Sequence, residues 1–247
     1  MAARLITIPF SHYCEKARWA LERAGVAFVE DGHLPIYAYL PLRKAGAGRT
    51  VPALVTDAGE VVADSTDILR WCDAHGAAPA LTPAELPDAA TLEDEFDRHL
   101  GPAARRLAYF HLLPSRRGFV ELLGKSRAPA WQVRTARVAR PAVVRLLRRG
   151  LRIDAAGAAR SREAIDRAFA DVAARLADGR RYLCGDRFTG ADLTFAALAA
   201  PVLVPPAYAS YLPTTLPPAF VALVDELRAT PAGRFGLRVY ADHRAAA

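Results

Sequence analysis

The first 76 residues alternate between short apolar segments and polar breaks, and this pattern predicts strands and helices in turn. Period-two alternation and β-branched side chains predict four strands: residues 4–8, 26–30, 50–56 and 60–63. A short Gly-containing turn joins the last two as a hairpin. Helical spacing predicts one helix from about residue 11 to 24 and another from 64 to about 74.

A different pattern follows residue 77. Residues 77–87 are rich in Ala and Pro, which is typical of a linker. Beyond them apolar residues recur at helical spacing, most clearly in residues 91–110, 116–123, 142–151 and 161–176. We therefore expect an N-terminal domain, residues 1–77, with the order β-α-β-(loop or helix)-β-β-α, and an all-helical domain, residues 88–247.

Composition is that of a globular protein, with 247 residues of which 52% are hydrophobic. The net charge of +7 is unevenly distributed, because residues 116–152 contain eleven basic residues and one acid, Glu121. Such a basic segment can attract anionic substrates, nucleic acid or a lipid surface. We favour the alternative that it is the solvated face of Arg-rich helices, because no nucleic-acid motif accompanies it.

The cysteines Cys14, Cys72 and Cys184 are odd in number and far apart, and no ligand-spaced His or Cys pairs accompany them. We therefore expect a reducing compartment, the cytoplasm, and no metal. The opening residues lack the features of a signal peptide. The longest apolar region, residues 193–204, contains a proline and is shorter than the roughly 20 residues of a membrane span.

Ser11 stands where the first strand gives way to the first helix. A helix begins with unpaired N–H groups and a positive dipole end, and both stabilise an anion. A hydroxyl there can donate to a substrate thiolate and lower the pKa of the thiol. The alternative is that Ser11 only caps the helix.

Two further motifs lie at strand ends. Val51-Pro52 precedes a strand. A cis peptide bond there would free the N–H and C=O groups of Val51 to pair with a bound peptide. A trans proline at a strand edge is the commoner alternative. Asp64-Ser65 opens a helix directly after a strand. The helix end and the Ser65 hydroxyl suit a carboxylate and the Asp64 carboxylate suits an ammonium, although an ordinary helix cap explains the same pair.

In this order, the motifs resemble the cytosolic glutathione S-transferase superfamily, in its bacterial-like form with a Ser-type active site. They are Ser-His-Tyr-Cys-Glu-Lys-Ala-Arg from residue 11, Val-Pro-Ala-Leu from residue 51, Asp64-Ser65, and Gly-Asp-Arg-Phe-Thr-Gly-Ala-Asp at residues 185–192. The last is similar to the family's capping box, Thr189 with Asp192, which begins a buried helix. The resemblance implies an α/β thioredoxin-like domain followed by an all-α domain.

The resemblance also implies a role for each matching residue. Ser11 matches the catalytic position that activates the thiolate of glutathione, the co-substrate. Val51 and Pro52 match the anchor of its cysteinyl part, and Asp64 and Ser65 match the contacts of its γ-glutamyl part. The implied protein is a cytoplasmic homodimer without a metal that conjugates glutathione to a small hydrophobic electrophile in detoxification.

Two features depart from the family pattern. Thr50 stands where a lysine often holds the glycyl carboxylate of glutathione, which leaves Arg43, Lys44 or Arg49 as substitutes. The residues that form the second-substrate pocket are also not determined. Five aromatic residues could line this pocket or belong to the hydrophobic core instead: Tyr109, Phe110, Trp131, Tyr208 and Tyr211.

Three functional alternatives stay open at this point. One is glutathione-dependent isomerisation. Another is thiol exchange with Cys14 as the nucleophile. The third is a non-catalytic protein of the same fold that binds a ligand, a partner or an anionic surface through residues 116–152.

Overall fold

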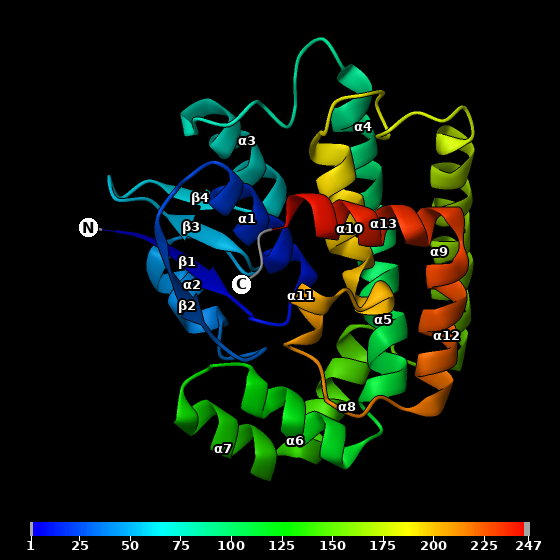
Figure 1. The fold of residues 1–247 in the computed structure, drawn as a ribbon. Helices are drawn as coiled ribbons and strands as arrows, with labels where there is room; N and C mark the ends of the chain where they lie inside the picture. Colours follow the sequence, from blue (N-terminus) through cyan, green and yellow to red (C-terminus); the bar gives the residue numbers. More distant parts are fainter. Residues whose placement is uncertain (1, 245–247) are drawn as a thin grey trace.

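The computed structural model describes residues 2–244, in which a small mixed sheet with its helices lies beside a larger group of helices (Figure 1). The strands are β1 (Ala3–Thr7), β2 (Phe28–Gly32), β3 (Ala53–Val55) and β4 (Val61–Ala63). Their order in the sheet is β2-β1-β3-β4. β1 pairs parallel to β2 and antiparallel to β3, and β3 pairs antiparallel to β4.

Both faces of the sheet are covered by helices: α1 (His12–Arg23), α2 (Tyr39–Ala45) and α3 (Ser65–His75). Successive side chains along a strand point to opposite faces of the sheet, so neighbouring residues of β1 pack in different clusters. Leu5 packs in the large core with α1 and α3, whereas Ile6 packs in a smaller cluster with Leu42 of α2. The thioredoxin-like α/β arrangement expected for this part is confirmed.

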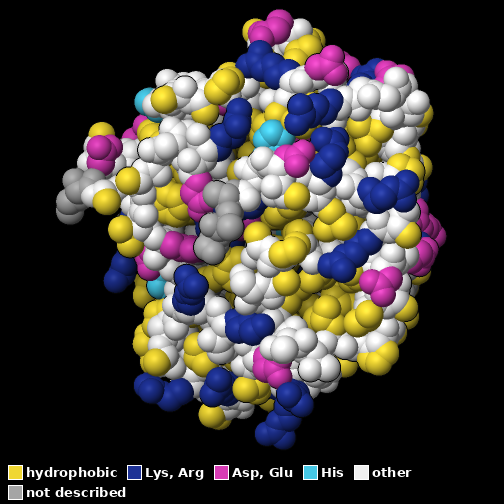
Figure 2. Space-filling model, in the orientation of Figure 1, with side chains coloured by type: hydrophobic (Ala, Val, Ile, Leu, Met, Phe, Trp, Pro, Cys, Tyr) yellow, Lys and Arg dark blue, Asp and Glu magenta, His cyan; other side chains and the backbone are white. Residues whose placement is uncertain are grey.

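The remainder of the described chain is helical. Its helices are α4 (Pro87–Glu95), the π-helical turn η1 (Phe96–Leu100), α5 (Gly101–Leu112), α6 (Arg116–Lys125), α7 (Ala130–Val138), α8 (Arg140–Gly150), α9 (Ala155–Leu176), α10 (Gly190–Leu203), α11 (Pro206–Ala209), α12 (Pro218–Ala229) and α13 (Pro231–His243). α6 and α7 lie at the lower end in Figure 1, and Figure 2 shows Lys and Arg side chains spread over that end. Among the described residues, no helix is long and apolar enough to cross a membrane.

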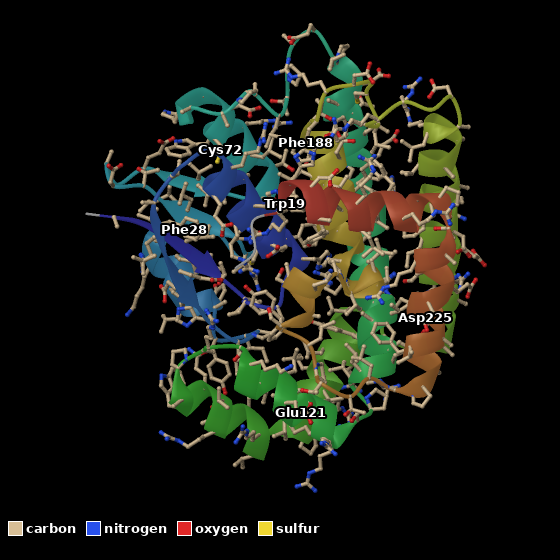
Figure 3. The ribbon with its side chains drawn as sticks, viewed as in Figure 1. Trp19, Phe28, Cys72, Glu121, Phe188 and Asp225 are labelled. Atoms are coloured by element: carbon tan, nitrogen blue, oxygen red, sulfur yellow. The ribbon has the colours of Figure 1, made fainter. Side chains whose placement is uncertain are left out.

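α10 is the central helix of this part, and all of its residues are buried. Its expected capping box is confirmed: the N–H of Thr189 donates to Asp192 Oδ2 at 2.8 Å, and the Thr189 hydroxyl donates to the same oxygen at 2.9 Å. α10 contacts α1, so the first helix of the sheet part packs directly on the helical core. In Figure 3, Trp19 of α1 lies beside α13, where its indole N–H donates to the His243 carbonyl at 3.0 Å.

Element boundaries differ from the sequence predictions for local reasons. Strand β2 begins at Phe28 rather than residue 26, because the Val26 N–H donates to the Leu21 carbonyl and thereby belongs to the end of α1. Strand β3 begins at Ala53 rather than residue 50. The helical pattern of residues 91–110 corresponds to the end of α4, all of η1 and most of α5, and the sequence did not delimit α7.

Candidate functional site

A cavity of about 630 Å³ lies between the sheet part and the helical part. One wall comes from the loop after β1, the segment before β3 and the residue before α3, represented by Ser11, Val51 and Asp64. The opposite wall comes from α5 and α8. Three of the sequence-predicted site residues, far apart along the chain, therefore face one space.

Ser11 occupies the N-cap position of α1 with an extended backbone, φ −80° and ψ 127°. Its side chain accepts no capping hydrogen bond from the first turn among the described residues, and Ser11 is half-buried at the cavity. The capping alternative therefore does not account for the hydroxyl. Its position beside the first N–H groups of α1 suits a bound anion.

The Val51–Pro52 peptide bond is cis, which rules out the trans alternative left open by the sequence. Val51 lines the cavity, and neither its N–H nor its C=O group pairs with other backbone within residues 2–244. The carbonyl of Pro52 accepts a hydrogen bond from the Asp64 N–H at 3.1 Å, which fixes this edge beside the start of α3. A free pair of backbone groups beside a cavity can bind an extended peptide as an added strand.

Asp64 is the N-cap of α3, and its Oδ1 accepts a hydrogen bond from the Thr66 N–H at 2.9 Å. Its backbone has a positive φ of 82°, a region that a residue other than glycine adopts rarely. The next residue, Ser65, is fully buried, and its Oγ has no hydrogen-bond partner among the described residues. Ser65, like Pro52, is not among the residues that line the cavity, so these two predicted site residues lie next to lining residues rather than in the lining. A buried hydroxyl without a partner costs free energy, which a hydrogen bond to a ligand oxygen at the start of α3 would offset.

Cys14 lies in the first turn of α1, fully buried and outside the cavity lining. Burial raises the pKa of its thiol to about 11, although the Arg18 charge and the hydroxyl of Ser11 act in the opposite direction. The thiolate is the reactive form, so this environment disfavours a nucleophilic role.

Arg49 and Thr50 line the cavity, whereas Arg43 and Lys44 do not. The Arg49 guanidinium lies 5.5 Å from the centre of the Tyr39 ring, which holds it at the end of the cavity near α2. Of the three basic residues considered as carboxylate ligands, the geometry thus favours Arg49.

Four further residues line the cavity: His12 and Tyr13, which belong to the motif from residue 11 but received no role from the sequence, and Asp97 and Arg105, which the sequence did not single out. His12 is buried, and its Nε2 donates a hydrogen bond to the carbonyl of Gly101 at 2.9 Å. Burial, with a smaller contribution from the charge of Arg105, lowers the pKa of His12 to about 3, so its ring is neutral. The Tyr13 hydroxyl donates to the backbone carbonyl of Asp97 at 2.9 Å. These contacts span more than 80 residues, which no local pattern encodes.

Lys16 of α1 lies outside the cavity lining and links α1 to α3, α4 and η1. Its side chain is completely buried, and its Nζ pairs with Glu93 and, at 3.0 Å, with Asp97 Oδ1. It also donates to the hydroxyl of Thr66 at 2.9 Å. One cation thus faces two carboxylates, and burial raises the pKa of Asp97. The spare negative charge at the cavity edge suits a cationic ligand group.

The far wall is mainly apolar, with Tyr109 of α5 and Leu147 of α8 among its residues. Of the five aromatic candidates, Tyr109 and Tyr208 line the cavity, whereas Phe110, Trp131 and Tyr211 do not. An apolar wall of this kind suits a hydrophobic ligand. Within the described part of the chain, no cluster of three or more His, Cys, Asp or Glu residues is arranged to hold a metal ion.

Two family profiles match the chain. The profile described as "Glutathione S-transferase, N-terminal domain" matches residues 10–75, and "Glutathione S-transferase, C-terminal domain" matches residues 155–229. Together they cover more than half of the 247 residues. No curated protein sequence matches the chain.

Solved structures of similar shape share little sequence with it. A glutathione S-transferase of Ceriporiopsis subvermispora in complex with glutathione is 17% identical with a TM-score of 0.65, over 99% of this chain and 98% of that one. A theta class glutathione S-transferase from Xanthomonas axonopodis pv. citri with glutathione bound is 22% identical with a TM-score of 0.56, over 96% of this chain and 97% of that one. At such identities the likeness shows the fold.

Proposed function

Because the chain belongs to the glutathione S-transferase family, we propose that it is an enzyme that binds glutathione in this cavity and transfers the tripeptide sulfur to an electrophile. One observation carries the proposal: Ser11, Val51 and Asp64 line the same cavity of about 630 Å³. The bound glutathione of two similar structures, named above, supports the same ligand class.

The chemistry of the near wall fits the three parts of glutathione. The free N–H and C=O groups of Val51 pair with the cysteinyl backbone. The unpartnered Ser65 hydroxyl and the first N–H groups of α3 bind the γ-glutamyl carboxylate, and Asp64, assisted by Asp97, attracts the ammonium. Arg49 pairs with the glycyl carboxylate.

Ser11 acts on the thiol. Its hydroxyl donates a hydrogen bond to the sulfur, and the positive end of α1 stabilises the thiolate in the same place. This stabilisation lowers the thiol pKa, so that more of the nucleophile exists at neutral pH. The sulfur then forms a bond to the electrophilic carbon, and a leaving group departs or a proton is added.

The apolar wall of α5 and α8 receives the second substrate, so we propose an electrophile with a hydrophobic body. A conjugating role in detoxification follows from this pairing. The family resemblance further implies a homodimer, and sedimentation equilibrium of the purified protein would test that part of the proposal separately.

The test is the variant Ser11→Ala with glutathione and 1-chloro-2,4-dinitrobenzene. If the hydroxyl lowers the thiol pKa by one or two units, about 1.4 to 2.7 kcal/mol, kcat/KM at pH 7 should fall about tenfold to hundredfold. The pH profile of kcat/KM should move to higher pH. Ser210→Ala, at an exposed serine outside the cavity lining, is the control and should match the wild type.

Two results would contradict the proposal at different levels. Equal activity and equal pH profiles of Ser11→Ala and wild type would remove Ser11 from the mechanism. Failure of the wild-type protein to bind glutathione in calorimetry would reject the transferase function itself.

A further inference from the structure

Arg105 of α5 is a charged residue of the cavity that the binding of glutathione does not explain. The cavity is lined by four charged side chains: Arg49, Asp64, Asp97 and Arg105. Asp64 caps α3 and Asp97 pairs with Lys16, whereas the guanidinium of Arg105 makes no hydrogen bond or ion pair within residues 2–244. Its Nε is buried and has no partner.

This arrangement is costly unless a ligand completes it. A guanidinium keeps its charge at any pH at which proteins fold, and its N–H groups need acceptors when water is excluded. The ring of Tyr13, whose centre lies 5.9 Å from the guanidinium carbon, offers a π face but no acceptor oxygen directed at Nε. Arg23 and Arg140 also have a buried Nε without a partner, but Arg105 differs from them because it lines the cavity, where an anionic ligand can supply acceptors to its unpaired guanidinium.

The position of Arg105 assigns that acceptor to the second substrate. Arg105, Ala108 and Tyr109 follow the i, i+3, i+4 spacing of one helix face, and all three line the cavity. This face lines the cavity together with Leu147 of α8, and the Arg105 guanidinium at its end lies over the ring of Tyr13 of α1. Arg105 therefore belongs to the helical wall that receives the electrophile.

The pairings proposed for glutathione point the same way. Under the proposed function, the ammonium of glutathione pairs with Asp64 and Asp97, and its two carboxylates pair with Ser65 at the start of α3 and with Arg49. None of these contacts uses Arg105, which lines the cavity beside Ala108 and Tyr109 of α5. We propose that the second substrate is an anionic electrophile, an apolar body with a carboxylate that Arg105 binds. This inference rests on the proposed transferase function.

A matched pair of substrates tests the proposal: 4-chloro-3,5-dinitrobenzoate and its neutral methyl ester. In both, the thiolate sulfur bonds to the ring carbon and chloride leaves with the electron pair of the carbon–chlorine bond. The variant Arg105→Met should lower kcat/KM for the benzoate at least tenfold more than for the ester, mainly through KM. Arg105→Lys, which keeps the charge, should recover part of the loss.

The control is Arg149→Met, which removes the same charge from an exposed position of α8 outside the cavity lining. Its benzoate-to-ester ratio should equal that of the wild type after correction for the uncatalysed rates. Circular dichroism establishes that each variant is folded. If Arg105→Met lowers both rates equally and moves the pH profile upward, Arg105 acts on the glutathione thiol and the proposal is wrong.

The proposal is separable from the transferase function. If the wild type conjugates neither compound, binding of the unreactive 3,5-dinitrobenzoate is measured by calorimetry. Binding that weakens at least tenfold in Arg105→Met, but not in Arg149→Met, supports the anion site even without catalysis. Equal binding in both variants, or none to the wild type, overturns it.

Discussion

Replacing Lys16 by Met should destabilise the protein strongly. Lys16 is completely buried, and its ammonium pairs with Glu93, which is 2% exposed, and with Asp97, which is 23% exposed. Methionine has a similar length and no charge, so it fills most of the space while leaving both carboxylates without their cation. The variant therefore isolates the electrostatic part of the interaction between α1 and the α4–η1 segment.

The expected loss is about 3–5 kcal/mol of unfolding free energy, the usual cost of removing one partner from a buried ion pair. The unpaired Glu93 carboxylate should account for most of this loss, because it is nearly inaccessible to water. Asp97 contributes less, since the solvent that reaches it screens its charge. The double variant Lys16→Met/Glu93→Leu should regain part of the loss, because it removes the charge that the single variant leaves unpaired.

Guanidinium denaturation followed by circular dichroism measures these free energies. Arg70→Met is the control, since it removes a pair with Asp67 in which both side chains are more than half exposed. That variant should lose less than about 1 kcal/mol. A Lys16→Met protein within 1 kcal/mol of the wild type would refute the view that this buried pair stabilises the fold.

The remaining predictions concern single residues of the site. Ser65→Ala should weaken glutathione binding about tenfold in calorimetry without lowering the melting temperature, because its Oγ has no partner to lose in the described structure. Cys14→Ala should keep the activity, and Cys14 of the wild type should react with a thiol reagent only in denaturant, since it is buried and its pKa is about 11. The folded protein keeps His12 neutral to about pH 3, whereas the unfolded chain protonates it below its ordinary value of 6.5. The free energy of unfolding should therefore fall as the pH drops between these values, by up to about 1.4 kcal/mol per pH unit. Urea denaturation at several pH values should give a smaller slope of unfolding free energy against pH in His12→Asn than in the wild type. Equal slopes would contradict this.

The sequence predicted the parts of the fold that local chemistry determines. Gly25 ends the first helix with a φ of +72°, and Thr189 with Asp192 begins α10 as a capping box. Each signal lies within a few residues of the element it controls, so a single sequence contains it. The division into domains 1–77 and 88–247 stays a prediction.

The site was predicted incompletely for the converse reason. Ser11 and Asp64 stand at strand ends, which the pattern of apolar residues locates. The choice of Arg49 over its neighbours depends on how the segment before β3 folds, and the place of Arg105 depends on how α5 packs against α1. Such information arises from tertiary contacts, which carry no short-range signal.

Helix α8 separates the selection of ligands from the maintenance of the fold. None of its residues is buried in the described structure, yet Leu146, Leu147 and Gly150 form part of the cavity wall. Leu146 and Gly150 are exposed, and exposed positions tolerate substitution at small cost to folding, usually within about 0.5 kcal/mol; Leu147 is half-buried against the core. Mutations in α8 can thus change which compounds enter while the molecule stays folded, so this helix is the place where natural variation or directed evolution would most readily yield new substrate ranges.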